Sequence, residues 1–169
     1  MLKILNDLEP FFMDNYRRIN VREYSREIGI SPPTASKLLH RLWKEGLLKI
    51  ESEKNYIFYF TDKESREFIH LSRIYWLGIL RKAGLIEYLE KELVNPVVIL
   101  FGSFSKAEVS PNSDIDIAVF SFSKKNPSLS RFQTSLKRDI SAHYYKKKED
   151  VPKDLLNSIL NGFLLSGSW

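Results

Sequence analysis

The stretch FGSFSKAEVSPNSDIDIAVF (residues 101–120) joins two apolar runs through a polar loop. Gly102 and Ser103 end the first run, and Asp114 and Asp116 lie two residues apart in the second. Because strand side chains alternate between faces, the two carboxylates point the same way, while Ile115 points toward a core. The stretch predicts two strands that assemble a polar site, or else an ordinary turn and two solvent-facing acids.

The spacing of the two acids suits divalent cations. Asp114 and Asp116 would lie about 7 Å apart along one strand face and can hold a pair of metal ions. Oxygen ligands without His or Cys favour Mg²⁺ or Mn²⁺ over zinc. Such ions would neutralise a triphosphate and assist in-line attack on its α-phosphorus. Gly102 would let the backbone approach phosphate, and Ser103 would add a hydroxyl and an N–H at a helix start.

These residues also resemble a family signature. Gly102-Ser103, ten further residues and Asp114-Ile115-Asp116 are similar to the pattern of the DNA polymerase β-like nucleotidyltransferase superfamily, and within it of the prokaryotic minimal nucleotidyltransferases. The match covers roughly residues 96–145, with Ala107 where the family commonly has glycine. The resemblance implies that Gly102 and Ser103 hold the phosphates of a nucleotide, and that Asp114 and Asp116 bind metal as catalytic acids.

The resemblance further implies a third carboxylate on a neighbouring strand. Asp139, in KRDISAHYY (137–145), is the candidate for this catalytic and metal-binding acid. Lys137 and Arg138 precede it, where family members usually have apolar residues. The alternative is that Asp139 is a solvent-facing acid paired with those two bases. In that case the enzyme is weak, or it binds nucleotide without turning it over.

Residues 1–60 are predicted to form three helices and then two short strands. Gly29 closes the helix of NVREYSREIGIS (20–31), and Ser31 before Pro32 predicts the N-cap of a helix that runs to about Glu45. The β-prone runs LLKIE and YIFYF flank a polar SEKN and predict a hairpin. This order resembles a winged helix-turn-helix.

The second helix of this module would present its outer face to double-stranded DNA. Lys37, Arg41 and Lys44 share one helix face, which can meet phosphates or guanine edges in a major groove. The full set of predicted DNA-binding residues is Pro33, Thr34, Lys37, His40, Arg41 and Lys44. The predicted inner face is Ile28, Ile30, Leu38, Leu39 and Leu42. The alternative is a winged helix used for protein contacts, with the basic stripe as a solvated face.

The rest of the chain predicts a second domain. Residues 62–93 are helical by pattern, and residues 96–169 alternate strands with helices. The predicted fold class is α+β: a winged helix-turn-helix (1–61), a long helical linker (62–94) and a small mixed-sheet nucleotidyltransferase fold (95–169). The apolar tail ILNGFLLSGSW (159–169) must pack on its own domain, on a second subunit or on a partner, which leaves a homodimer open.

Composition excludes some classes of protein. The chain has 169 residues, a net charge of +5 and no cysteine, so disulfides and thiolate metal sites are excluded. We find no apolar run of membrane-helix length and no signal peptide, and we expect a cytoplasmic protein without membrane contact. The mild basic excess permits nucleic-acid binding without arguing for it.

We expect a Mg²⁺-dependent enzyme that transfers a nucleoside monophosphate to an acceptor. The expected group is AMP, and its expected donor is ATP. The resemblance to antitoxin-type members implies a HEPN-type toxin as that acceptor, with DNA binding for autoregulation. One alternative is a DNA-binding transcription regulator whose nucleotidyltransferase domain is degenerate or only senses nucleotide. A structural partner-binding protein is a further alternative.

Overall fold

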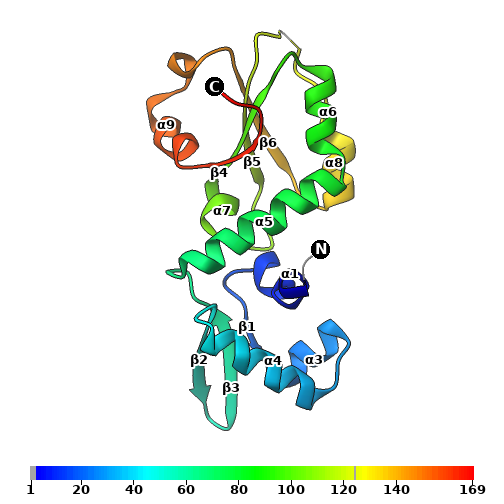
Figure 1. Cartoon of the computed structure of the whole chain (residues 1–169), viewed down its shortest axis with the longest axis vertical. Coiled ribbons are helices and arrows are strands. Elements are labelled where there is room, and N and C mark those ends of the chain that lie inside the picture. Colours follow the sequence, from blue (N-terminus) through cyan, green and yellow to red (C-terminus); the bar gives the residue numbers. More distant parts are fainter. Residues whose placement is uncertain (1–2, 124) are drawn as a thin grey trace. The chain divides into compact units, whose positions relative to one another are not determined.

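The computed structural model describes residues 3–123 and 125–169, which form two compact units (Figure 1). The N-terminal unit contains the chain up to Ser72 together with Ala107–Pro111. The C-terminal unit contains Arg73–Lys106 and Asn112–Trp169. The change from one unit to the other falls inside helix α5 (Arg66–Lys82), so the helical region does not form a separate linker body. Among the described residues, no helix is both long enough and apolar enough to span a bilayer.

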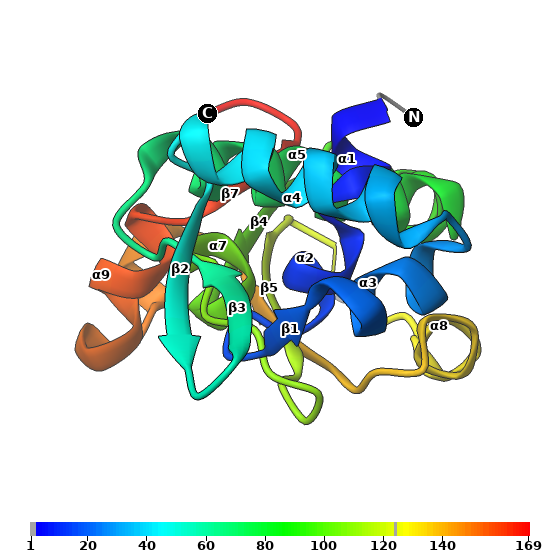
Figure 2. The same ribbon diagram turned by 90° about the horizontal axis from the view of Figure 1, so that it is seen from below.

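The N-terminal unit contains helices and a small antiparallel sheet in the order β1-β3-β2. Figure 2 shows α3 beside α4, with the β2–β3 hairpin following α4. Its elements are α1 (Lys3–Asp7), α2 (Glu9–Met13), β1 (Arg18–Asn20), α3 (Val21–Ile28), α4 (Pro32–Lys44), β2 (Leu48–Glu53) and β3 (Tyr56–Thr61). The predicted winged helix-turn-helix is therefore present, with a third strand, β1, that the sequence pattern did not indicate.

Local signals account for the boundaries of α3 and α4. Asn20 caps α3 by accepting hydrogen bonds from the N–H groups of Arg22 and Glu23, and Glu23 bonds back to the Asn20 N–H. Gly29 ends α3 in the left-handed conformation, with φ of 73°. Ser31 caps α4 through the Thr34 N–H, as its position before Pro32 predicted.

The core of this unit differs from the predicted inner face. Leu39 and Leu42 are fully buried as expected, whereas Ile28, Ile30 and Leu38 are half-buried. Tyr24 and Ala35, which were not predicted, are fully buried. The Tyr24 hydroxyl donates to the Asp7 carbonyl at 2.6 Å, which satisfies the polar end of this large ring in the core.

The C-terminal unit contains a four-stranded mixed sheet in the order β6-β5-β4-β7, with helices on both sides (Figure 1). β5 pairs in parallel with β6, and β4 pairs antiparallel with both β5 and β7. Its further elements are α6 (Leu85–Glu92), β4 (Val97–Phe101), α7 (Gly102–Lys106), β5 (Ile115–Phe120), α8 (Ser130–Leu136), β6 (Ile140–Tyr145), a 3₁₀ turn (Lys148–Asp150), α9 (Lys153–Leu160) and β7 (Phe163–Ser166). The predicted mixed sheet is confirmed, and the helical pattern over 62–93 is divided at Gly84 into α5 and α6.

The two faces of the sheet are covered by different helices. In Figure 1, α6 and α8 lie on one side of the sheet and α9 lies on the other. α9 packs Ile159 onto Val97, Ile99, Ala118 and Phe120. On the opposite face of β4 and β5, the strand residues that alternate with these are fully buried: Val98, Leu100, Ile115, Ile117 and Val119. Burial on both faces explains why these strands are continuous apolar runs.

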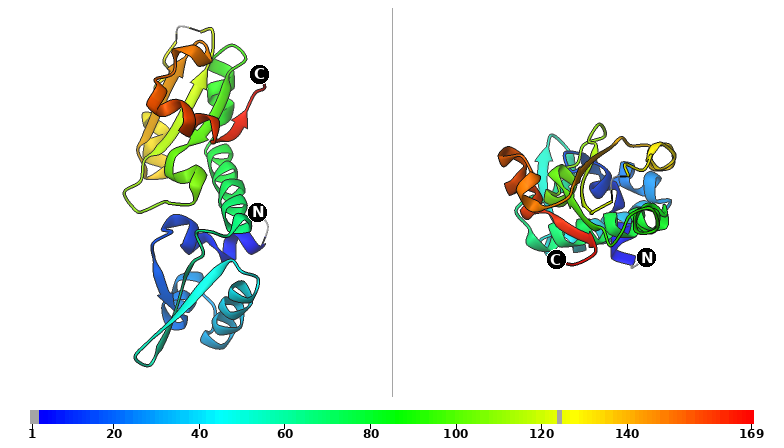
Figure 3. Two further views of the ribbon diagram at one scale, coloured as in Figure 1. Left: turned by 90° about the vertical axis from the view of Figure 1, so that its left-hand side faces the viewer. Right: turned by 90° about the horizontal axis from the view of Figure 1, so that it is seen from above.

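The apolar tail forms an edge strand of its own unit. β7, red in Figure 3, pairs with β4 through Ile99–Leu164 and Leu100–Phe163. Gly162 allows this pairing, because a Cβ there would lie 2.6 Å from both Ile99 Cγ2 and the Leu100 carbonyl oxygen. The sequence left open whether the tail packs on its own domain, on a second subunit or on a partner. In the structure it packs on its own domain.

Candidate functional site

The two acids of the motif lie at the N-terminal end of β5, the second strand of the sheet. Asp114 directly precedes the strand and is exposed, and Asp116 is its second residue and half-buried. Ile115 and Ile117 are fully buried on the other face. The alternation expected from the spacing is therefore present, although β5 begins one residue later than the pattern indicated.

β6 brings a second set of polar residues to the same end of the sheet. The parallel register places Ser141 beside Asp116 and His143 beside Ala118. The Ile115 N–H donates to the Asp139 carbonyl at 2.8 Å, so Asp139 is the backbone neighbour of the Asp114 position. We call Asp114, Asp116, Asp139, Ser141 and His143 the acidic end of the sheet.

Asp139 stands in the predicted place along the backbone, but its side chain is engaged elsewhere. It precedes β6 by one residue and is exposed. Its carboxylate accepts a hydrogen bond of 3.3 Å from Gln133 Nε2 on α8. Over residues 3–123 and 125–169, the structure gathers no group of three His, Cys, Asp or Glu side chains that could hold one metal ion. Asp114, Asp116 and Asp139 are thus not assembled as one three-acid cluster.

Gly102 makes room for Asp116. Gly102 opens the five-residue helix α7, directly after β4, with φ of +67°. A Cβ at this position would lie 2.3 Å from Asp116 Oδ2. The sequence suggested that glycine is needed for backbone approach to phosphate, and the structure adds a further reason, because the Asp116 carboxylate occupies the side-chain space. Ser103 follows as the second residue of α7 and is half-buried.

The environment of Asp116 disfavours its negative charge. Burial raises the pKa of the Asp116 carboxyl above its ordinary value of 3.8, and the charge of Asp114 raises it further. The His143 imidazole acts in the opposite direction and lowers this pKa. His143 Nε2 is 3.3 Å from Ser141 Oγ, and its ring lies 5.6 Å from that of Phe101. A bound cation would offset both the cost of burying the Asp116 charge and its repulsion by Asp114.

The raised pKa of Asp116 predicts a pH-dependent stability. The folded state binds this proton more tightly than the unfolded state, so the free energy of unfolding falls as pH rises from 3.8 through the raised pKa, and stays lower above it. We expect Asp116→Asn to remove this effect and to raise the free energy of unfolding at pH 7. Urea unfolding from pH 4 to 8 with a chelator measures it. A variant advantage that does not grow with pH would contradict the expectation.

Arg138 is a positioning residue that the sequence did not reveal. It is buried, and its Nη1 donates to the carbonyl of Ser113, the residue before Asp114, at 3.1 Å. Its guanidinium lies 5.5 Å from the ring centroid of Phe104 and 5.9 Å from that of Trp76. The charge therefore stabilises the loop that leads into the motif. From its position next to Asp139, the sequence suggested that the Arg138 side chain is exposed and pairs with that acid. The structure shows instead that the side chain is buried.

The donor set of the acidic end fits a hard divalent cation. Asp114 and Asp116 supply carboxylate oxygens, the ligands that Mg²⁺ and Mn²⁺ prefer. The two acids repel each other, and burial already disfavours the Asp116 charge, so a cation would be electrostatically favourable there. These two residues could hold such an ion, whereas the Asp139 carboxylate is hydrogen-bonded to Gln133.

The six residues predicted to contact DNA are all exposed, and they lie on or at one helix, α4. They differ in how free their charges are. Arg41 Nη2 lies 3.4 Å from Asp7 Oδ2, and its Nε lies 3.7 Å from Glu45 Oε1. The His40 ring packs at 5.0 Å from that of Trp43. Lys37 and Lys44 are absent from the ion pairs of the described residues, so they are the cations most available to a phosphate backbone.

Comparison with known proteins agrees with both parts of this picture. Residues 84–162 match the family model for polymerase β nucleotidyltransferases, and residues 13–49 match a model for winged helix-turn-helix DNA-binding domains. No curated protein and no solved structure matches the chain. The first match spans α6 through α9 and thus contains the whole acidic end, and the second contains α3 and α4. The chain therefore combines a region similar to winged helix-turn-helix DNA-binding domains with a region similar to polymerase β nucleotidyltransferases.

Proposed function

We propose that the chain transfers a nucleoside monophosphate, AMP from ATP, to an acceptor group in a reaction that requires Mg²⁺ or Mn²⁺. The observation that carries the proposal is the pair Asp114 and Asp116 at one end of β5, with Gly102 leaving space for Asp116, inside a nucleotidyltransferase family match. Proteins of this type generally use divalent metals. A cytoplasmic location, where ATP and Mg²⁺ are abundant, is part of the proposal.

In the proposed reaction, an acceptor oxygen attacks the α-phosphorus of ATP. The bond from this phosphorus to the bridging oxygen breaks, pyrophosphate leaves, and the acceptor loses its proton. Asp114 and Asp116 would hold the cation, which would supply charge neutralisation of the triphosphate. The N–H groups of Gly102 and Ser103, in the first turn of α7, have no partners within the helix and are proposed to face phosphate oxygens. Asp139 is proposed to complete the metal site or to accept the proton.

Nucleotide binding tests this proposal directly. We expect the wild-type chain to bind ATP with Mg²⁺ and to bind it at least about 10-fold more weakly with a chelator, because the triphosphate and the two carboxylates repel each other without the cation. Isothermal titration calorimetry under both conditions measures the difference, and GTP, CTP and UTP define base preference. Absence of binding for all four nucleotides with Mg²⁺ would contradict the proposed function.

The acceptor is proposed to be a partner protein of the HEPN toxin type. The support is the resemblance to antitoxin-type nucleotidyltransferases, together with the fused winged helix-turn-helix, which would allow autoregulation. A homodimer, which would present two copies of α4, belongs to the same proposal. Label from α-³²P-ATP should appear in such a toxin when the two proteins are mixed, and label found only in nucleic acid would contradict this acceptor.

One observation favours the alternative of a regulator that senses nucleotide without transferring it. Asp139 is hydrogen-bonded to Gln133, and no three-acid cluster forms in the described ranges. Under this alternative, ATP changes DNA binding but is recovered unchanged. Chromatography of ATP after prolonged incubation with the protein, Mg²⁺ and the toxin distinguishes the two functions, because pyrophosphate appears only in the first.

The basic face of α4 is proposed to bind double-stranded DNA. Removing the two unpaired lysines in Lys37→Gln/Lys44→Gln should weaken binding to a 24-base-pair duplex and lower the slope of log K against log salt by about 2, since each phosphate contact contributes about 0.9. Arg41→Gln should have a smaller effect, because Arg41 already pairs with Asp7 and Glu45. Fluorescence anisotropy between 50 and 250 mM salt measures both.

The matched control for this experiment is Lys82→Gln/Lys153→Gln, which removes two exposed lysines from the C-terminal unit. An equal loss of affinity in the control and in Lys37→Gln/Lys44→Gln would contradict the assignment of α4 as the DNA-binding face. It would indicate that only the net charge of the chain matters.

A further inference from the structure

The end of the sheet opposite the acids carries an aromatic and basic cleft. It has a volume of about 520 Å³ and is lined by Phe120, Phe122, Trp169 and the consecutive lysines 146–148, among others. Asp116 and Phe120 are four residues apart on β5, which is about 13 Å at the rise of a strand. The cleft is therefore separate from the acidic end. We call Phe122, Trp169 and Lys146–Lys148 the lysine cleft.

The aromatic rings of the lysine cleft are unusually exposed. Phe122 is 84% exposed and Trp169 is 71% exposed, the two largest values among the large hydrophobic side chains of the described residues. The Trp169 ring is held edge-on against Phe120 at a centroid distance of 4.8 Å. A ring fixed in this way and still open to solvent can stack on a planar group without losing much side-chain freedom.

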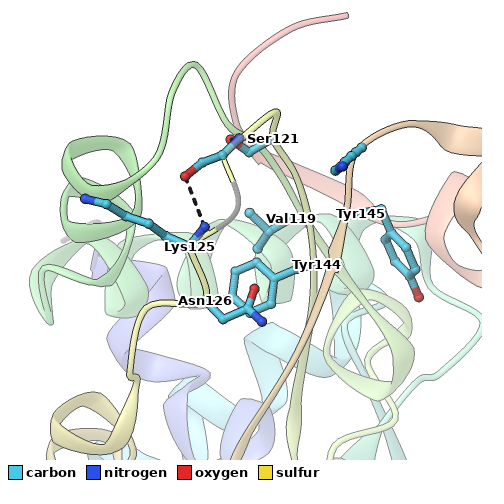
Figure 4. A pocket seen from close by; sticks show the side chains of 8 residues that line it. Val119, Ser121, Lys125, Asn126, Tyr144 and Tyr145 are labelled. Carbon is cyan, nitrogen blue, oxygen red and sulfur yellow. Dashed lines mark hydrogen bonds between the residues drawn. The ribbon is translucent and has the colours of Figure 1, made fainter.

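A second hollow of about 260 Å³ adjoins the lysine cleft and shares Ser121 and Lys146 with it. Figure 4 shows the Tyr144 ring in this hollow, next to Asn126 and Val119. The Tyr144 hydroxyl donates to the Pro127 carbonyl at 3.4 Å, which orients the ring. The two hollows therefore adjoin at the C-terminal ends of β5 and β6, through Ser121 and Lys146.

The charge of the lysine cleft points to a polyanion. Lys146, Lys147 and Lys148 are exposed, and none of them is in an ion pair of the described residues; Glu149 is an acid that also lines the cleft. Lysine is depleted at protein–protein interfaces, whereas aromatic rings between lysines are the usual surface for single strands of nucleic acid. Duplex DNA hides the faces of its bases, so it cannot stack on these rings.

We propose that the lysine cleft binds single-stranded nucleic acid, with bases stacked on Phe122 and Trp169 and phosphates contacted by Lys146–Lys148. The binding is independent of the proposed nucleotidyl transfer, because it uses neither Asp114 nor Asp116. The chemistry is common to RNA and single-stranded DNA, and the two are separated by experiment.

The test uses the full chain with Lys37→Gln/Lys44→Gln, so that α4 contributes little. Fluorescein-labelled dT12 and U12 are titrated by anisotropy at 50 to 250 mM salt. We expect binding of at least one of them, at least about 10-fold weaker after Phe122→Ala/Trp169→Ala, since each stacked base contributes a factor of this order. Lys146→Gln/Lys147→Gln/Lys148→Gln should lower the slope of log K against log salt by about 2, at about 0.7 for each phosphate.

Two control variants make the result specific. Lys82→Gln/Lys106→Gln/Lys153→Gln removes the same charge from lysines of the same unit that do not line the cleft, and it should change affinity less. Asp114→Asn/Asp116→Asn should bind the oligonucleotides at least as well as its parent. Phe122→Ala alone alters a side chain that is almost wholly in solvent, so its effect cannot come from a folding defect.

Several results would overturn the proposal. One is no binding of dT12 or U12 at 50 mM salt up to 100 µM protein. A second is equal loss in the lysine control, or no change after Phe122→Ala. A third is equal binding of a glutamate peptide with the same charge, which would make the cleft an acidic-peptide site. A fourth is that the wild-type protein is a dimer, and that Phe122→Ala/Trp169→Ala makes it monomeric without lowering its oligonucleotide affinity. The cleft would then be a contact with a second copy of the chain.

Discussion

Asp114→Asn/Asp116→Asn is expected to lower the rate of pyrophosphate release from ATP by about 1,000-fold or more. The two carboxylates would hold the cation that neutralises the triphosphate, and such a cation contributes several kcal/mol to the transition state. Asparagine keeps the shape of each side chain and removes the charge. Pyrophosphate release with Mg²⁺ and the acceptor, together with label transferred from α-³²P-ATP, measures the loss.

Two controls connect this loss to the metal. Glu108→Gln removes an exposed acid from the same loop and should leave the rate within about 3-fold of wild type. The unfolding temperature of Asp116→Asn should be no lower than that of wild type at pH 7, because the substitution removes a charge that burial disfavours. A variant that keeps a tenth of the wild-type rate would contradict a metal-binding role for these acids.

Gly102→Ala is the second change for which we expect a large effect. Its φ of +67° costs an alanine about 1 to 2 kcal/mol. The new Cβ would also lie 2.3 Å from Asp116 Oδ2, so the carboxylate must move. A displacement of about 1 Å in a catalytic group can cost about 100-fold in rate. We expect a loss of this size in pyrophosphate release, together with a lower free energy of unfolding.

Gly84→Ala separates the two causes. Gly84 has φ of +77° and nothing within 4 Å of an added Cβ, so its substitution introduces the backbone strain without the clash. Gly84→Ala should lose about 1 to 2 kcal/mol of stability and keep its rate. Adding Gly102→Ala to Asp116→Ala, where the carboxylate is absent, should likewise cost only the strain. Equal rates for Gly102→Ala and Gly84→Ala would contradict the role of Gly102 in making room for Asp116.

The sequence by itself determined the local features of this protein. Ser31 before Pro32 and Gly29 define the ends of two helices through hydrogen bonds between near neighbours, so their pattern is visible without any tertiary contact. The same holds for the β2–β3 hairpin and for the common direction of Asp114 and Asp116, which depends only on the alternation of a strand. Both family matches fall on these local patterns.

What only the tertiary structure decided depends on contacts between residues far apart in the chain. The clash that explains Gly102 is with Asp116 on the neighbouring strand, and the inward course of Arg138 depends on Phe104 and Trp76. The apolar tail forms strand β7 against β4, and Gly162 permits this pairing because it has no Cβ to clash with Ile99 and Leu100.

The outcome for Asp139 has the same origin. The sequence predicted that Asp139 lies on a strand next to β5, and its backbone does lie beside Asp114. Its side chain, however, is hydrogen-bonded to Gln133 on α8. The lysine cleft likewise combines Phe122, Lys146–Lys148 and Trp169 from three separate segments. Periodicity describes which way a side chain points from its own strand or helix. It does not predict which residue from elsewhere in the chain contacts that side chain, because this depends on the packing of the whole unit.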